Sequence, residues 1–216
     1  MDRTSTLAKA VLAASVIGGL SYIYAWHLKL PQAPELIWKW SGVGLLSVYA
    51  ALKARSLDGW LLAAVMFFGA LGDVLLGLAG LTVGALAFLA GHLTAVGLYL
   101  RNRRPSPSRS QFALALLIVP ATVLVAYLLP LNRAGAPGIA LYATGLSLMA
   151  ATAWLSRFPR YRVGLGALMF LISDLIIFAR AGRFDGNFTA DLAVWGLYYA
   201  GQLMICLGVS RTLARA

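Results

Sequence analysis

The chain has 216 residues, of which 61% are hydrophobic and 12% charged, and its net charge is +11. Soluble domains carry about 25% charged residues, so this composition excludes an ordinary soluble protein and indicates an all-α integral membrane protein. The eighteen Lys and Arg residues are spread over short segments between apolar runs, which argues against a nucleic-acid-binding face.

Apolar runs of about 20 residues predict eight transmembrane helices, forming a single domain over residues 1–216. In chain order the runs cover residues 7–26, 35–52, 59–80, 81–100, 112–129, 138–155, 163–181 and 192–209. The connections are too short for a soluble domain, so a site must be built from the helices and their ends. The first run is too long for a secretory signal and lacks an Ala-x-Ala motif, so we expect it to be retained.

The basic residues predict the topology. With the N-terminus in the cytoplasm, thirteen of the eighteen Lys and Arg residues lie inside, and five lie outside, namely Lys29, Lys39, Arg133, Arg180 and Arg183. The positive-inside rule then places both termini in the cytoplasm, and we expect the inner membrane of a bacterium. Cys206 is the single cysteine, so the chain has no internal disulfide and no cysteine-based metal site.

Two aspartates, Asp73 and Asp174, lie within the third and seventh runs. A carboxylate inside a bilayer costs about 2.5–3.5 kcal/mol on insertion scales, so such a pair indicates function. Gly69 and Gly77 lie four residues to either side of Asp73, and this face fits either a helix packing seam or a slot for a slim substrate. A phenylalanine lies four residues to either side of Asp174, so its carboxyl group is in dry surroundings and can serve as a proton donor.

The third and fourth runs resemble the seventh and eighth, which predicts a parallel internal repeat. In this alignment Asp73 is equivalent to Asp174, and His92 is equivalent to Gln202. His92 and Gln202 each lie nine residues before an arginine at the end of the run. At 1.5 Å per residue, both lie roughly 13 Å from the cytoplasmic edge. We therefore expect the four side chains to converge on one buried polar cavity. The alternative is that apolar helices resemble one another by composition alone.

Two further polar residues have alternative interpretations. His92 is either a hydrogen-bonded structural residue or, with two aspartates at comparable depth, part of the site. A metal site of two Asp and one His lacks a His-x-x-x-His spacing, so we expect no metal and no cofactor. Lys39, between two tryptophans, either extends to the membrane interface or binds an anionic headgroup.

Several motifs occur together in consecutive runs, including Gly-Asp, Ser-Asp and Tyr-Tyr-x-x-Gln. The positions concerned are Lys39, Gly72, Asp73, Leu75, Leu76, Phe88, His92, Tyr142, Met149, Gly166, Ala167, Phe170, Ser173, Asp174, Tyr198, Tyr199, Ala200 and Gln202. In this combination the chain resembles the YhhN-like membrane proteins, the lysoplasmalogenase family, over nearly its whole length. It departs from the family pattern at Trp40, where a proline is usual, and at Ala95, where an aromatic residue is usual.

The resemblance implies hydrolysis of the vinyl ether bond of a lysoplasmalogen to a fatty aldehyde and glycerophosphoethanolamine or glycerophosphocholine, so the partners are a lysophospholipid and membrane lipids. Protonation of a vinyl ether gives an oxocarbenium-like cation that water attacks, and paired carboxyl groups suit this chemistry as they do in glycosidases. Our hypothesis is that Asp174 donates the proton and Asp73 stabilises the cation, with the reverse assignment open. Substrate-binding roles are expected for Lys39 at the phosphate and for His92, Ser173, Tyr198, Tyr199 and Gln202.

Three other functions fit the same residues. The first is hydrolysis of another lysolipid, and the second is proton-coupled transport, since paired acids and repeats also occur in carriers. The third is a non-catalytic membrane protein whose aspartates hold the helices together. Turnover of a panel of lysolipids distinguishes the hydrolases, and proton-linked uptake in vesicles favours transport. If the aspartates only hold the helices together, replacing them lowers stability without removing any chemistry.

Overall fold

The computed structural model describes residues 3–131, 133–180 and 187–215. In these ranges the chain forms eight α-helices and no extended strand, which confirms the all-helical prediction. The helices are α1 Arg3–Ser21, α2 Gln32–Lys53, α3 Leu57–Ala79, α4 Leu81–Arg101, α5 Arg109–Leu128, α6 Ala136–Leu155, α7 Leu165–Arg180 and α8 Phe188–Leu213. Arg183, which the topology prediction uses, lies outside the described residues.

Seven of the helical segments in the described part are long and apolar enough to cross a membrane. Three of them include short helical turns, which are η1 Tyr22–His27, η2 Arg133–Gly135 and the π-helical η3 Arg160–Gly164. The exception is α2, which has 22 residues and is therefore roughly 33 Å long. Its charged residues, among them Glu35, Lys39 and Lys53, lower its hydropathy.

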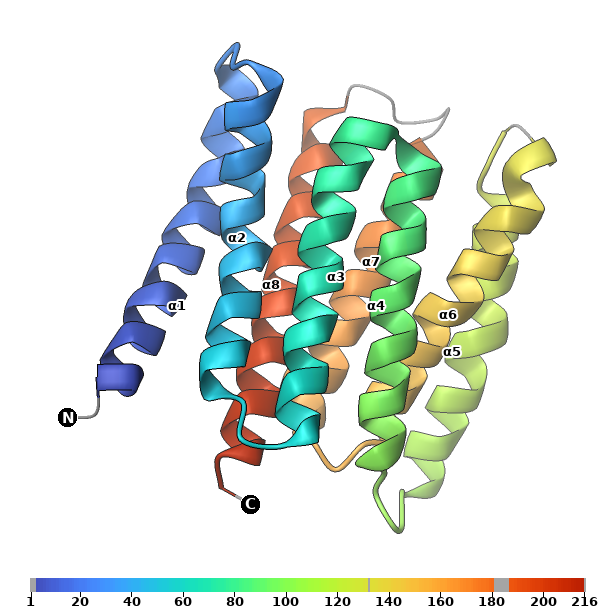
Figure 1. Cartoon of the computed structure of the whole chain (residues 1–216). Coiled ribbons are helices and arrows are strands. Elements are labelled where there is room, and N and C mark those ends of the chain that lie inside the picture. The colour runs from blue at the N-terminus through green and yellow to red at the C-terminus, as the bar shows by residue number, and fades with distance from the viewer. Residues whose placement is uncertain (1–2, 132, 181–186, 216) are drawn as a thin grey trace. The chain divides into compact units, whose positions relative to one another are not determined.

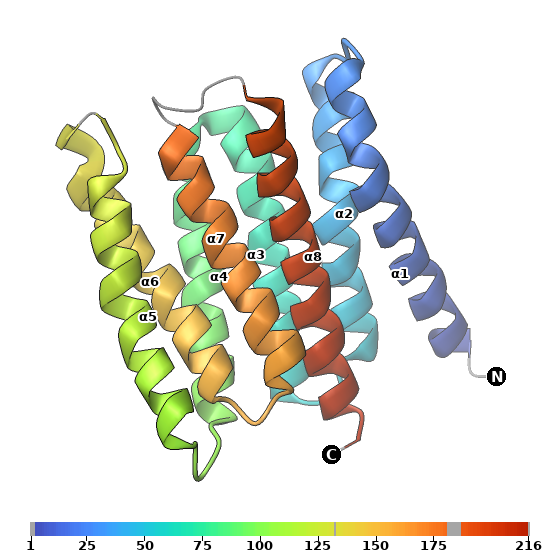
Figure 2. The same cartoon turned by 180° about the vertical axis from the view of Figure 1, so that it is seen from behind.

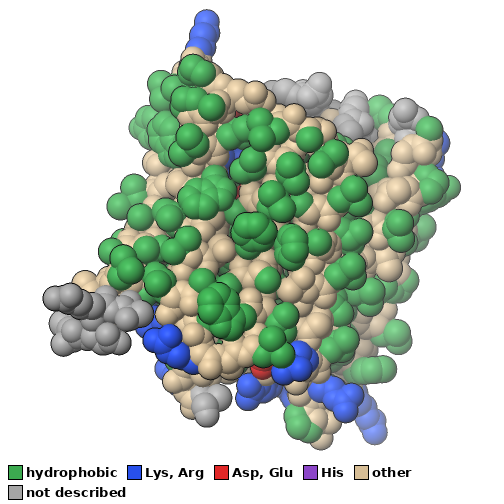
Figure 3. All heavy atoms as spheres, in the orientation of Figure 1, with side chains coloured by type: hydrophobic (Ala, Val, Ile, Leu, Met, Phe, Trp, Pro, Cys, Tyr) green, Lys and Arg blue, Asp and Glu red, His purple; other side chains and the backbone are tan. Residues whose placement is uncertain are grey.

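Hydrophobic side chains cover the helix faces seen in Figure 3, and Lys and Arg gather at the helix ends. On α3, Trp60, Phe67 and Leu78 are each more than half exposed. Large exposed apolar surfaces are rare on monomeric soluble proteins, whereas a bilayer solvates them. The chain is an integral membrane protein.

The chain forms two compact units, residues 1–95 with 209–216 and residues 96–208. In the first unit α1, α2 and α3 lie side by side (Figure 1). Ser15 Oγ on α1 donates a hydrogen bond to the carbonyl of Gly42 on α2 at 2.6 Å. The predicted single domain stays a prediction.

In the same unit α3 and α4 form a tight hairpin. Gly80 connects them with φ of 85°, a backbone conformation that glycine adopts without strain. A Cβ added at Gly72 on α3 would lie 2.7 Å from the ring of Phe88, and one added at Gly84 would lie 2.8 Å from Leu76 Cα. The two helices therefore approach closely, and their register places Phe88 beside the residue that precedes Asp73.

In the second unit α5 and α6 form a hairpin, and α7 and α8 pack against each other (Figure 2). The connections that follow α4 and α6 are joined. Arg157 N donates to the carbonyl of Asn102 at 2.7 Å, and Arg157 Nε donates to Asn102 Oδ1 at the same distance. Arg104 N donates to the carbonyl of Leu155 at 3.0 Å. These bonds fix the end of α4 against the end of α6.

Each unit contains a helix crossing at a glycine. A Cβ added at Gly91 on α4 would lie 3.6 Å from the carbonyl oxygen of Val65 on α3. A Cβ added at Gly201 on α8 would lie 2.6 Å from the carbonyl oxygen of Gly166 on α7. The predicted repeat makes Gly91 equivalent to Gly201 and Val65 equivalent to Gly166. The two crossings support the repeat, which stays a prediction.

Candidate functional site

Asp73 is a buried member of an ion pair between α2 and α3. Lys39 Nζ lies 3.2 Å from Asp73 Oδ1, and the two side chains are 18% and 4% exposed. The sequence suggested an interfacial or headgroup-binding role for Lys39. In the structure its ammonium group lies against the carboxylate and compensates its charge.

Asp174 has a different partner in the second unit. The hydroxyl of Tyr142 on α6 donates a hydrogen bond of 2.6 Å to Asp174 Oδ2, and both residues are buried. The ring of Phe178 packs edge-on against that of Tyr142, with centroids 5.7 Å apart. Phe170 and Phe178 are both buried, which confirms the aromatic surroundings predicted for Asp174.

An aromatic cluster lies between α7 and α8. The rings of Phe170 and Tyr198 meet edge-on with centroids 5.0 Å apart, and Trp195 stacks on Tyr199 at 6.0 Å. Tyr198 and Tyr199, both predicted site residues, are 5% and 4% exposed. Because Phe170 is one turn from Asp174, this cluster forms the apolar wall next to the acid.

Ser173 and Gln202 lie at different levels of the α7 and α8 pair. Ser173 Oγ donates a hydrogen bond to the carbonyl of Val194 at 3.0 Å. Gln202 is eight residues beyond Val194, so it lies roughly 12 Å further along α8. Its side chain is 1% exposed, and Gln202 Oε1 has no hydrogen-bond partner among the described residues. This carbonyl oxygen can accept a hydrogen bond from water or a substrate hydroxyl.

His92 is also buried, at 3% exposure, on α4. Since Phe88 packs on Gly72, His92 lies roughly 6 Å beyond the level of Gly72, the residue that precedes Asp73. The polar side chains of the first unit therefore lie on α2, α3 and α4, and those of the second unit lie on α6, α7 and α8. That Asp73 and Asp174 face one cavity stays a prediction.

The glycines beside Asp73 contact neighbouring helices. A Cβ at Gly77 would lie 2.6 Å from Leu36 Cδ2 on α2. Gly69 N lies 3.9 Å from the position of a Cβ added at Gly91 on α4. Of the two interpretations of this small face, the structure shows the packing seam, and close packing brings α2 near enough for Lys39 to reach Asp73.

The partners of the two aspartates were not predicted from the sequence, although a signal for them exists. Lys39 and Asp73 each lie seventeen residues from Ser56, in the turn between α2 and α3. Tyr142 and Asp174 each lie sixteen residues from Phe158, in the turn between α6 and the π-helical η3. In an antiparallel helical hairpin, residues equidistant from the turn lie at the same level. Polar residues at such positions are candidate pairs.

The two aspartates also lie at the same distance from the ends of their helices. Asp73 is six residues before the end of α3 at Ala79, and Asp174 is six residues before the end of α7 at Arg180. Each is therefore roughly 9 Å from that end.

Residues 34–209, from α2 to α8, match the profile of the YhhN family. The chain belongs to the YhhN family. Two curated relatives of this YhhN protein, from Mycobacterium bovis and Mycobacterium tuberculosis, are named lysoplasmalogenase. Each is 32% identical over 204 residues, which cover 87% of this chain and 77% of the relative. No solved structure matches the chain.

Proposed function

We propose that this YhhN protein is a membrane-embedded hydrolase that cleaves the vinyl ether bond of lysoplasmalogens. The products are a fatty aldehyde and a glycerophospho-alcohol such as glycerophosphoethanolamine or glycerophosphocholine. The observation that carries the proposal is the pair of buried carboxyl groups with different partners, a cation at Asp73 and a phenol at Asp174. The name of the mycobacterial relatives supports it.

The reaction needs an acid and a carboxylate. Asp174 transfers a proton to the outer carbon of the vinyl ether, and the positive charge that forms is shared by the inner carbon and the ether oxygen. Asp73, as a carboxylate, stabilises this cation and accepts a proton from the water that attacks the inner carbon. The resulting hemiacetal separates into aldehyde and alcohol. Asp73 then releases the proton that it accepted, and exchange with water returns a proton to Asp174.

The neighbours of the aspartates support this division of roles. Lys39 compensates the charge of Asp73, which favours Asp73 as the carboxylate. When substrate binds, the flexible side chain of Lys39 turns to the phosphate and leaves Asp73 to face the cation. Tyr142 fixes the orientation of the Asp174 carboxyl group. We assign Gln202 Oε1 to water or the glycerol hydroxyl because it is buried without a partner among the described residues.

The depth of the carboxyl groups also supports a lysolipid substrate. In a lysoplasmalogen the vinyl ether is attached to the glycerol, directly below the headgroup. A carboxyl group roughly 9 Å from a helix end lies at the level of such a bond when the headgroup stays at the interface. His92, Ser173, Tyr198 and Tyr199 complete the proposed substrate contacts.

The test is aldehyde release from a lysoplasmalogen by the purified protein. Asp73→Asn and Asp174→Asn should each reduce kcat by about 10²-fold or more, the usual contribution of a general acid or base. Asp191→Asn is the matched control, since Asp191 is 31% exposed and pairs with Arg180 at a helix end. Two folded variants with wild-type rates would contradict the mechanism. Equal turnover of the matching ester lysolipid would assign the protein to a different hydrolase class.

A further inference from the structure

Glu35 is a carboxylate of α2 that forms no ion pair with the other residues that the structure describes. It lies in the first turn of α2, and its Oε1 accepts a hydrogen bond from the hydroxyl of Tyr22 at 3.3 Å. Lys39, one turn further along α2, lies against Asp73 instead. The charge of Glu35 is therefore available to a cation that the described part of the chain does not supply.

Two aromatic rings of η1 lie beside Glu35. Tyr22, which bonds to Glu35, is 6% exposed, and the ring of Trp26 packs edge-on against that of Tyr22 with centroids 6.0 Å apart. Trp38, three residues after Glu35, donates a hydrogen bond from Nε1 to Ser21 Oγ at 2.9 Å and so fastens α2 to the residue before Tyr22. A carboxylate attracts an ammonium group by charge, and an aromatic ring attracts it by its face. These side chains together match an ammonium ligand.

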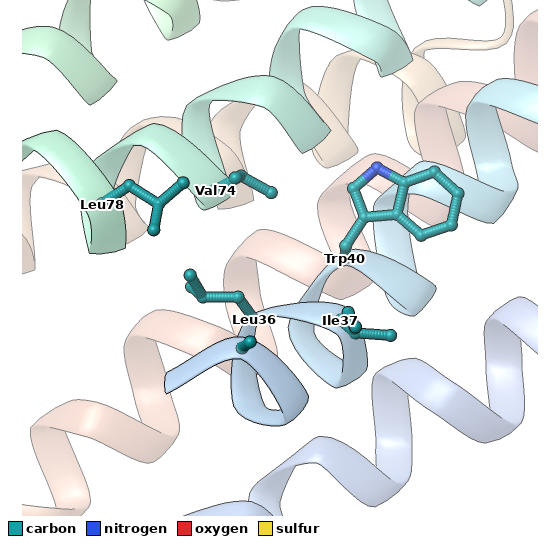
Figure 4. Close-up of a pocket in the computed structure, with 6 residues that line it drawn as sticks. Leu36, Ile37, Trp40, Val74 and Leu78 are labelled. Atoms are coloured by element: carbon teal, nitrogen blue, oxygen red, sulfur yellow. The ribbon is translucent and has the colours of Figure 1, made fainter. Parts of the chain in front are cut away.

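The side chains that follow Glu35 on α2 face apolar residues of α3. In Figure 4, Leu36 and Ile37 of α2 lie across from Val74 and Leu78 of α3. A charged headgroup finds no partner on these side chains. On the first two turns of α2 it meets two charges, Glu35 and the lysine one turn beyond it.

The charges of the first unit match the order of groups in a zwitterionic lysophospholipid. Lys39 lies at the level of Asp73, and Glu35 lies roughly 6 Å closer to the helix end. In the lipid, the phosphate is next to the glycerol and the ammonium group is outermost. Two carbon atoms join the phosphate oxygen to the nitrogen in an ethanolamine or choline headgroup, which is a comparable distance. With the phosphate at Lys39, the ammonium group therefore reaches Glu35.

We propose that Glu35 binds the ammonium group of a zwitterionic lysophospholipid, with the rings of Tyr22 and Trp26 beside it. The proposal rests on the proposed function, because it assigns the headgroup subsite of the same substrate. Both charges of the headgroup are then compensated, the phosphate by Lys39 and the ammonium by Glu35. A headgroup without an ammonium group, such as phosphoglycerol, places negative charge near Glu35 with no compensating cation. Glu35 therefore selects ethanolamine and choline headgroups.

The first experiment compares headgroups. Aldehyde release is measured in nanodiscs with two vinyl ether lysolipids that differ only in the headgroup, phosphoethanolamine or phosphoglycerol. Glu35→Gln keeps an acceptor for the Tyr22 hydroxyl but removes the charge. It should raise KM for the ethanolamine substrate on the order of tenfold, the effect of one lost hydrogen bond to a charged group. It should not raise KM for the phosphoglycerol substrate, and kcat should stay unchanged. Glu35→Asp keeps the charge and should keep part of the preference.

The matched control is Asp191→Asn, which removes one carboxylate charge at the beginning of α8 in the other unit. It should keep the headgroup preference of the wild type. A folded Glu35→Gln protein with the wild-type ratio of the two KM values would overturn the proposal. An equal rise of both KM values would give Glu35 only a structural role and would also overturn it.

The second experiment does not depend on turnover. Lysophosphatidylethanolamine and lysophosphatidylglycerol, which carry an ester in place of the vinyl ether, are titrated onto the detergent-solubilised protein, and the bound lipid is measured by native mass spectrometry. The wild type should bind the ethanolamine lipid on the order of tenfold more tightly, and Glu35→Gln should lose this preference. Equal affinity of the wild type for the two lipids would reject the ammonium site. A wild type that shows the preference but releases no aldehyde would reject the proposed function alone.

Discussion

Lys39 and Asp73 form a buried pair, so removal of the lysine takes away the cation that lies 3.2 Å from the carboxylate. Lys39→Met should lower the free energy of unfolding by about 3–5 kcal/mol, the usual penalty for breaking a buried ion pair. Lys39→Arg keeps the charge and should recover part of this loss. Unfolding in detergent measures the effect, with Lys53→Met at the end of α2 as the control. Equal stability of Lys39→Met and Lys53→Met would show that the ion pair does not stabilise the fold.

Tyr142 acts on the site through a single hydroxyl group. Tyr142→Phe keeps the ring that packs on Phe178 but removes the donor to Asp174 Oδ2, at a cost of about 1–3 kcal/mol in stability. We expect kcat to fall and the pH profile of kcat to move, because the hydroxyl contacts the proposed proton donor. Tyr161→Phe is the control, as Tyr161 is 70% exposed. A stability change with an unchanged pH profile would leave Tyr142 only a packing role.

At the level of single residues, the sequence identified the two carboxyl groups but not the side chains that contact them. An aspartate inside an apolar run is visible in the sequence, because the cost of burying a charge depends on the residue and its immediate surroundings. The partner depends on which faces of two helices meet. Lys39 is flanked by tryptophans, and this pattern is equally typical of a lysine at the membrane interface. Tyr142 was singled out only because it belongs to the family pattern, which does not identify its hydrogen-bond partner.

Among the helices of the second unit, α7 and α8 make a close backbone contact at Gly166 and Gly201. Gly201→Ala should destabilise the protein, since the added Cβ would lie 2.6 Å from a backbone oxygen that has little freedom to move. Gly196→Ala, on the same helix with open space around it, should be neutral or slightly stabilising. Thermal unfolding of the two variants in one detergent compares them directly. A Gly201→Ala protein as stable as Gly196→Ala would show that the helices can separate without cost.

The helix α2 shows how contacts with neighbouring helices accommodate charged residues. Among the described helices α2 is the one that hydropathy does not mark as a membrane span, and it includes the charged residues Glu35 and Lys39. The structure accommodates both, since Tyr22 Oη donates to Glu35 Oε1 at 3.3 Å and Lys39 pairs with Asp73. The sequence predicted a helix there from its remaining apolar residues, and the prediction is confirmed.

For the whole molecule, the positive-inside rule predicts that both termini lie in the cytoplasm. A reporter that is active only in the cytoplasm should be active when fused after Ala216, and inactive when inserted after Lys29 in the connection between α1 and α2. A reporter inserted after Ser106, between α4 and α5, should be active. The opposite pattern would invert the topology and would place the Asp73 end of α3 at the cytoplasmic face.

The sequence alone determined that this is an integral membrane protein with eight helical segments, because hydropathy over about 20 residues is a local property. It also determined the family, which the match over residues 34–209 confirmed. Only the tertiary structure decided that Lys39 meets Asp73, that Tyr142 meets Asp174, and that the glycines beside Asp73 form a packing seam. These contacts depend on the rotation and register of whole helices. The rotation and the register are set by side-chain packing between segments that are distant in the sequence. The sequence of a single segment therefore does not reveal them.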